Sequence, residues 1–242
     1  GHRVLVPLLR AMDEKVDTLV LSHSDSDHTG GAVAVLRMQP RAALLSSIGD
    51  AHELQAERSA QRCGAGQRWH WDGVDFQVLH PAAADYAAAA RPNAMSCVLR
   101  VSNGVRTALL AGDIEQAQEA RLVENFGRAL GTVAVAGGVS TSSTRTDSLL
   151  RADVLLVPHH GSKTSSSEVF LDAVAPSLAL VQAGYRNRFG HPAQAVLERY
   201  RFRGIPVTDS PHCGAAYWRS THALQVTCQR ELARRYWHHR FP

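Results

Sequence analysis

The stretch from Leu21 to Gly31, Leu-Ser-His-Ser-Asp-Ser-Asp-His-Thr-Gly-Gly, places two histidines and two aspartates close together behind an apolar run. Close carboxylates repel one another, and charge at the end of a buried strand is costly unless a cation compensates for it. The alternative is a polar turn whose side chains cap the next helix. Because a cap does not need four ligand-type residues, the stretch predicts a metal site.

The whole chain sets broad limits on the protein. Its 242 residues are 45% hydrophobic, which is enough for one domain with a sizeable core. A net charge of +4 favours the approach of an anionic partner but does not identify one. We find no apolar run of about 18 residues that could span a membrane, and no signal-peptide pattern. Because the chain begins Gly-His-Arg-Val, we expect a soluble piece of a longer protein.

The four cysteines are far apart and form no Cys-x-x-Cys pair, which argues against a zinc ribbon or a redox motif. We predict buried free thiols. Only Cys213 and Cys228, on segments that could be neighbouring strands, are candidates for a disulfide, and the sequence leaves their pairing open.

Short apolar runs alternate with helical patterns, which predicts an α/β fold. The expected strands are Thr18–Leu21, Ala42–Leu45, Phe76–Leu79, Cys97–Val101, Thr107–Ala111, Val154–Val157 and Leu178–Gln182. The expected helices are Thr29–Arg37, Ile114–Phe126, Ser166–Val174 and Ala193–Arg203. Asn103-Gly104 predicts a type I′ hairpin turn. One domain over residues 1–242 with a loop insertion at about 128–150 fits this pattern.

Further polar groups follow three of these strands. Gly112-Asp113, Pro158-His159-His160-Gly161 and Gly190-His191-Pro192 each stand near a strand end or a helix start. Loops at the carboxyl ends of strands gather at one rim of an α/β sheet, so residues distant in sequence can converge there. An isolated Asp113 would be an ordinary helix cap, whereas two adjacent histidines indicate function more strongly.

In this order, the motifs resemble the metallo-β-lactamase superfamily, and most closely the C-terminal hydrolase-like domain of ComEC-type DNA-internalisation competence proteins. The resemblance rests on residues 22–31, Leu110-Ala111-Gly112-Asp113-Ile114-Glu115, Val157-Pro158-His159-His160-Gly161-Ser162 and residues 184–192. It implies an αββα sandwich over nearly the whole chain. The family usually has two more strands before the segment that begins here at Gly1, so we expect these N-terminal strands to be missing.

The resemblance also implies a site for two divalent metal ions. His23 and Asp25 would bind one ion, Asp27 and His28 the other, and Asp113 would bridge both. For the last ligand we favour His159, with His160 and His191 as substrate-binding or proton-transfer groups, although either could be the ligand instead. Asp27 would also act in catalysis by orienting the attacking water.

Two positions depart from the wider superfamily. Asp25 replaces the usual second histidine, and Asn93-Ala94-Met95-Ser96 stands where a third histidine is normally found. An oxygen-rich site suits manganese or magnesium, although zinc could still compete. We expect manganese or zinc as cofactors, and no small organic cofactor. The expected substrate-binding residues are Asn93, Ser96, Ser162 and Lys163, and the run Ser162–Ser166 is either a phosphate-binding nest or a set of helix caps.

The predicted function is metal-dependent cleavage of phosphodiester bonds in DNA. By the resemblance, the longer protein would be a channel in the bacterial inner membrane, and this domain would degrade the strand that is not imported. Its partners would be single-stranded or duplex DNA and the channel part of the same protein. The alternatives are a small-molecule metallohydrolase, such as a lactonase, thioesterase or β-lactamase, and a non-hydrolytic domain that binds DNA or supports the channel.

Overall fold

The computed structural model describes residues 1–88, 90–127, 148–234 and 236. The chain divides into two compact units, which are described separately. The first unit comprises Gly1–Leu99 with Ala111–Ile114, and the second unit comprises Arg100–Leu110 with Glu115–Pro242. The chain passes between them within strand β6 (Val98–Ser102). Most of the predicted insertion lies outside the described residues, and the grouping of both units into one domain stays a prediction.

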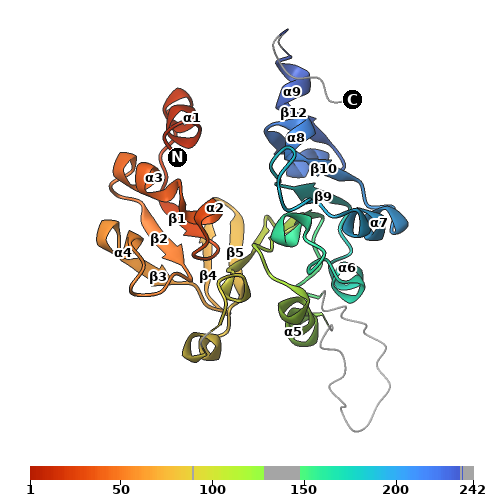
Figure 1. Ribbon diagram of the computed structural model, residues 1–242, viewed down its shortest axis with the longest axis horizontal. Coiled ribbons are helices and arrows are strands. Elements are labelled where there is room, and N and C mark those ends of the chain that lie inside the picture. The colour runs from red at the N-terminus through yellow and green to blue at the C-terminus, as the bar shows by residue number, and fades with distance from the viewer. Residues whose placement is uncertain (89, 128–147, 235, 237–242) are drawn as a thin grey trace. The chain divides into compact units, whose positions relative to one another are not determined.

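The first unit is built on a parallel sheet with strand order β1-β2-β3. Its strands are β1 (Thr18–Leu21), β2 (Ala43–Ser46) and β3 (Ala60–Arg62). Parallel neighbours need a crossover connection. Helices α2 (Ser26–Thr29) and α3 (Ala32–Met38) lie in the first crossover, α4 (Leu54–Glu57) lies in the second, and α1 (Leu5–Ala11) precedes the sheet (Figure 1).

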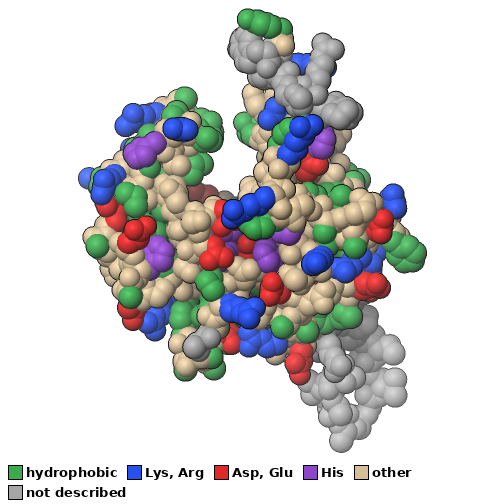
Figure 2. Space-filling view, in the orientation of Figure 1, with side chains coloured by type: hydrophobic (Ala, Val, Ile, Leu, Met, Phe, Trp, Pro, Cys, Tyr) green, Lys and Arg blue, Asp and Glu red, His purple; other side chains and the backbone are tan. Residues whose placement is uncertain are grey.

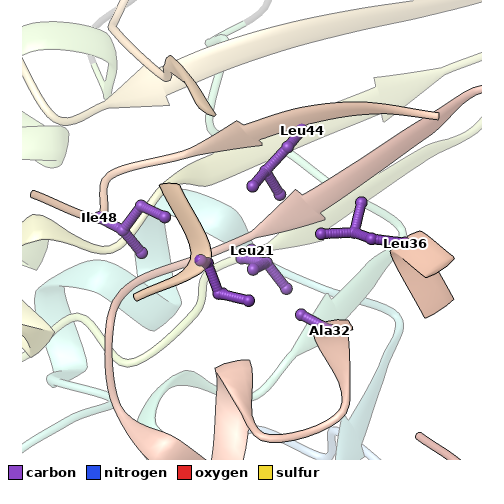
Figure 3. Packing of buried hydrophobic residues seen from close by; sticks show 6 residues of the cluster. Leu21, Ala32, Leu36, Leu44 and Ile48 are labelled. Atoms are coloured by element: carbon purple, nitrogen blue, oxygen red, sulfur yellow. The ribbon is translucent and has the colours of Figure 1, made fainter. Parts of the chain in front are cut away.

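A small apolar core holds the end of β1 in place. Figure 3 shows side chains from the strands and from α3 turned toward one another. The buried members are Leu21, Ala32, Leu36, Leu44, Ile48 and Leu54. Leu21 is the last residue of β1 and is 7% exposed, so the polar loop that follows it leaves from a packed anchor. This packing positions Ser22 to His28.

The first unit also contains an antiparallel hairpin, β4 (Arg68–Trp71) and β5 (Val74–His80). Its turn residues Asp72 and Gly73 both have positive φ, at 47° and 79°, which a type I′ turn requires. Two short 3-10 helices follow, η1 (Ala83–Ala87) and η2 (Asn93–Met95).

The second unit contains a parallel sheet in the order β10-β9-β8-β7. Its strands are β7 (Thr107–Leu110), β8 (Val154–Leu156), β9 (Leu178–Val181) and β10 (Val207–Asp209). Helices α5 (Gln116–Phe126), α6 (Glu168–Val174) and α7 (Gln194–Phe202) alternate with them, and 3-10 helix η3 (Pro158–Gly161) follows β8. The fully buried side chains include Leu109, Leu155, Phe170, Leu171 and Tyr200.

A short hairpin, β11 (Ala216–Trp218) and β12 (Val226–Cys228), follows β10. It is accompanied by α8 (Ser210–Cys213), η4 (Ser220–His222) and α9 (Gln229–Leu232). A disulfide joins Cys213 to Cys228, whose Cα atoms are 4.5 Å apart. The strands and helices of this segment were not predicted from the sequence; only the possible pairing of its two cysteines was.

The α/β class is confirmed, and each expected strand lies within two residues of an observed one. Three predictions were wrong in detail. The cysteines are not free thiols, because Cys63 also pairs with Cys97. Helix α3 begins three residues later than expected, and helices α5 and α6 begin two residues later, because the residues before them lie in a separate helical turn or in loops. Asn103 does not adopt positive φ; its side chain instead accepts bonds from the amides of Val105 and Arg106, so the turn is not type I′. Within the described ranges, every helix is too short or too polar to cross a membrane.

Candidate metal centre

Five predicted ligands lie together in the first unit. The Nε2 atom of His28 is 3.2 Å from Oδ1 of Asp113, and Nε2 of His23 is 3.9 Å from Oδ2 of the same carboxylate. His23 Nε2 is also 3.5 Å from Oδ2 of Asp25, and His28 Nε2 is 3.8 Å from Oδ2 of Asp27. One ligand atom each from Asp27, His28 and Asp113 lie within 4.8 Å of one another. Asp113 thus lies between two histidine–aspartate pairs.

The cluster has a buried side and an open side. His23 is fully buried and the side chain of Asp113 is 7% exposed. The side chains of Asp25 and Asp27, in contrast, are 46% and 62% exposed. Burial, followed by the charge of neighbouring His28, lowers the pKa of His23. A neutral imidazole at this position keeps a lone pair that can bind a metal.

Ser22 supports both histidines from behind. Its Oγ atom lies 2.9 Å from Nδ1 of His23 and 2.9 Å from Nδ1 of His28. A hydroxyl has one proton, so at least one of these rings must donate its Nδ1–H to Ser22. A ring that donates its Nδ1–H in this way keeps the lone pair on Nε2, which is then the atom that can bind a metal.

The residues fit divalent cations. The Nε2 atom of His23 is buried and has no hydrogen-bond partner among the described residues, and it faces carboxylate oxygens of Asp25 and Asp113. A lone pair aimed at carboxylates in a buried position is unfavourable unless a cation lies between them. Two imidazoles and three carboxylates form a donor set that is richer in oxygen than in nitrogen, which suits harder divalent ions.

Gly112 allows Asp113 to approach the serines. Its φ is +58°, and a Cβ atom added there would lie 2.9 Å from Cβ of Ser96 and 3.0 Å from Cβ of Ser22. No side chain fits such a space without displacing its neighbours. The Gly-Asp pair is therefore required both by backbone conformation and by packing.

Ser96 is a further hydroxyl next to the proposed ligands. It is fully buried; its Oγ accepts a bond from the Asp113 amide at 3.0 Å and lies 3.3 Å from Nδ1 of His23. This buried hydroxyl supports the ligands from behind, and the predicted substrate contact of Ser96 stays a prediction. Asn93 is half-buried on η2, and its role in substrate binding stays a prediction.

The second unit gathers the remaining predicted histidines. The ring centroids of His159 and His191 are 5.9 Å apart, and those of His159 and His160 are 6.4 Å apart. His159 and His160 have φ values of 50° and 54°, a left-handed conformation that is costly for residues other than glycine and asparagine. Such strain is concentrated at functional sites.

Both histidines of η3 are held through Nδ1. His160 Nδ1 lies 2.7 Å from the Gln182 carbonyl, which can only accept, so His160 carries its proton on Nδ1. His159 Nδ1 lies 3.3 Å from Oγ1 of Thr164 and 3.5 Å from a carboxylate oxygen of Glu115. Both rings therefore have the support that metal-binding histidines usually show. The choice of His159 as the last ligand stays a prediction.

Within the run Ser162–Ser166, the amide of Ser166 already has a partner inside the protein. The buried carboxylate of Glu119 accepts bonds from the amides of Ser166 and Ser167, at 2.5 Å and 2.7 Å. These amides are thus already satisfied within the protein. Ser162 is 5% exposed and its Oγ lies 3.1 Å from Oγ1 of Thr164, whereas Lys163 is exposed. Of the two predicted substrate contacts here, only Lys163 is placed at the surface.

Sequence reasoning missed three supporting residues, Ser22, Glu115 and Glu119. Ser22 directly precedes the first ligand, and its position next to His23 was the one available signal. Glu115 and Glu119 lie one helical turn apart around the start of α5, and nothing in their spacing indicates contact with residues 159–167. Only tertiary packing brings these carboxylates to that loop.

Comparison with known proteins agrees with this geometry. The profile described as "Metallo-beta-lactamase superfamily" matches residues 3–184. The chain is 38% identical over 212 residues to "Competence protein ComA" of Neisseria gonorrhoeae, covering 87% of this chain and 26% of that protein. It is 34% identical over 195 residues to "Recombination protein 2" of Haemophilus influenzae, covering 81% and 21%.

A third relative is "ComE operon protein 3" of Bacillus subtilis, which is 31% identical over 230 residues, covering 90% of this chain and 26% of that protein. The chain therefore spans about a quarter of the length of these curated relatives. The family match extends over most of the chain and includes the five clustered ligands and the histidines of η3. The protein belongs to the metallo-β-lactamase superfamily.

Proposed function

We propose that this chain is a metal-dependent phosphodiesterase that cleaves DNA, and that it degrades the non-imported strand during competence DNA uptake. The observation that carries the proposal is the arrangement of His23, Asp25, Asp27 and His28 around Asp113. The names of the competence relatives support the biological setting. In that setting, the longer protein is a channel in the bacterial inner membrane.

When bound, divalent cations would supply an ionised water and stabilise negative charge on the phosphodiester. The chain's own groups perform the remaining tasks. Asp27 has an exposed side chain and accepts a proton from, or orients, the attacking water. His160, whose Nδ1 proton is committed to Gln182, can carry a second proton at Nε2 toward the leaving oxygen.

His191 and Lys163 complete the proposed site. His191 lies next to His159 and holds phosphate oxygens, and the exposed Lys163 supplies positive charge near the same loop. Manganese or zinc is the proposed cofactor. We rank DNA cleavage above hydrolysis of a small molecule because Asp25 makes the donor set richer in oxygen than a zinc hydrolase of small molecules would need.

The test is a cleavage assay with metal-depleted protein supplied separately with Mn²⁺, Zn²⁺ or Mg²⁺. Labelled single-stranded and duplex DNA are compared with a lactone and with nitrocefin. We expect metal-dependent DNA cleavage that the Asp113→Asn variant loses, with no turnover of the small substrates. Turnover of the lactone or nitrocefin alone would indicate the small-molecule hydrolase, and metal-independent DNA binding without cleavage would indicate the non-hydrolytic domain.

The last ligand is assigned by metal content. His159→Ala, His160→Ala and His191→Ala are each titrated with Mn²⁺ and their stoichiometry is measured. We expect His159→Ala to lose one ion, and His160→Ala and His191→Ala to retain two and to lose turnover. Loss of an ion from His160→Ala or His191→Ala instead would move the ligand to that residue.

A further inference from the structure

The loop from Tyr185 to Phe189, here called the aromatic–arginine loop, exposes two large rings. Tyr185 is 44% exposed and Phe189 is 66% exposed. Single exposed hydrophobic residues are common on protein surfaces. Two aromatic residues within one turn, however, leave a considerable apolar area in water, and such areas mark interaction sites when other features agree.

Guanidinium groups accompany both rings. The Cζ atom of Arg186 lies 5.2 Å from the centroid of the Tyr185 ring, and that of Arg188 lies 4.7 Å from the centroid of the Phe189 ring. Both arginines are exposed. Aromatic faces combined with arginine provide base stacking and phosphate neutralisation together, which is how proteins bind single-stranded nucleic acid.

Asn187 makes this loop rigid. Its Nδ2 donates to the carbonyls of Gly184 and His191, at 2.9 Å and 2.5 Å. Its Oδ1 accepts from the amides of Phe189 and His191, at 3.2 Å and 3.0 Å. A loop ordered before binding avoids most of the entropy cost of ordering its side chains on contact with a ligand.

The loop is continuous with the histidine cluster of the second unit. The ring of Phe189 is stacked on that of His191, with centroids 5.8 Å apart and planes 19° apart. His191 in turn lies 5.9 Å from His159. A base stacked beside Phe189 would therefore lie in the same part of the second unit as these histidines.

The charge of the surface as a whole indicates a nucleic-acid site less well than the aromatic–arginine loop does. Figure 2 shows Lys and Arg side chains distributed over the visible face, interspersed with Asp and Glu. The net charge is only +4. A dispersed charge of this size does not concentrate nucleic acid at one place.

We propose that the aromatic–arginine loop is a stacking platform for the bases of single-stranded DNA, with Arg186 and Arg188 neutralising its phosphates. The proposal rests on the proposed nuclease function and adds the form of the substrate to it. Paired bases in a duplex keep their faces inside the stack, so the platform favours single strands or frayed ends.

The test measures binding in EDTA, so that cleavage cannot interfere. The fluorescence anisotropy of a short labelled oligothymidine is recorded with wild type and with Tyr185→Ala, Phe189→Ala and Phe189→Tyr. We expect about 5- to 100-fold weaker binding for each alanine variant, and recovery with Phe189→Tyr. The matched control is Phe202→Ala on α7, whose ring is 88% exposed. Circular dichroism checks that each variant folds.

Arginine variants test the phosphate contacts. Arg188→Ala should reduce the slope of log K against log salt by about 1, whereas Arg201→Ala, exposed on α7, should leave it unchanged. Equal affinity for an abasic oligomer, for duplex DNA, or for the Phe189→Ala and wild-type proteins would each overturn the platform.

Turnover of bis-p-nitrophenyl phosphate with Mn²⁺ separates the two proposals, because this substrate has no base to stack. Wild-type turnover together with unchanged DNA binding by Phe189→Ala removes the platform and keeps the nuclease. Loss of DNA binding by Phe189→Ala without any wild-type turnover removes the nuclease and keeps the platform.

Discussion

The Oγ atom of Ser22 lies 2.9 Å from the Nδ1 atom of His28 and makes an equal approach to His23. One hydroxyl thus orients two proposed metal ligands that are five positions apart in the sequence. Because both contacts involve Nδ1, the Nε2 atoms are left to face the carboxylates of Asp25, Asp27 and Asp113.

Ser22→Ala should weaken metal binding by about 10- to 100-fold, because both rings lose the hydroxyl that orients them. Isothermal titration of metal-depleted protein with Mn²⁺ measures the effect without reference to activity. Ser26→Ala, at an exposed serine of the same loop, is the control and should bind as wild type does. Equal affinity in both variants would remove the proposed role of Ser22.

Gly112→Ala should destabilise the fold and disturb the metal centre together. The new Cβ would press on Ser96 and Ser22, so we expect an overpacking cost of about 1–3 kcal/mol in addition to the backbone cost of positive φ. Gly104→Ala is the matched control. Gly104 also has positive φ, but in the part of the chain that the structure describes no atom lies within 4 Å of the added Cβ, so this variant carries only the backbone cost of about 1–2 kcal/mol. Urea unfolding of both variants separates the two contributions.

Glu119 should make stability depend on pH. Burial raises the pKa of its carboxyl in the folded protein, so folding disfavours the ionised form. Relative to Glu119→Gln, the free energy of unfolding of the wild type should fall as pH rises from about 4.3, the usual value for Glu, through the raised pKa. Urea unfolding at several pH values measures the difference. A difference that does not change with pH would contradict the prediction, and Glu124→Gln, at an exposed position of α5, serves as the control.

From the two disulfides we expect a certain number of reactive thiols, and a loss of stability when one disulfide is removed. All four cysteines are paired, so a denatured and unreduced sample should show no reactive thiol, and a reduced one should show four. Replacing Cys213 and Cys228 by serine opens a loop with a sequence separation of 15, and should lower the free energy of unfolding by about 3 kcal/mol. Detection of thiols before reduction would show that the cysteines are free, as the sequence alone had suggested.

Local patterns predicted much of the secondary structure. The run Thr18–Leu21 matches β1 at both ends, because a short apolar segment followed by polar residues has few alternatives to a buried strand. The helix predicted from Thr29 was displaced, since Ser26–Thr29 forms a separate turn and α3 begins only at Ala32. Asp72-Gly73 and Asn103-Gly104 read alike in the sequence, but only the first adopts two positive φ values.

The sequence by itself determined which residue types are available for chemistry. Four of the ligand groups lie close together in Ser22–His28, so their pattern is recognisable even where the predicted element bounds are slightly wrong. Only the tertiary structure decided which hydroxyls and carboxylates support them. Ser96 and Asp113 approach His23 from segments far along the chain. Glu119 accepts hydrogen bonds from the amides of Ser166 and Ser167. Cys63 forms a disulfide with Cys97. Such contacts depend on how strands and helices pack, and packing brings together residues whose separation in sequence carries no periodic signal.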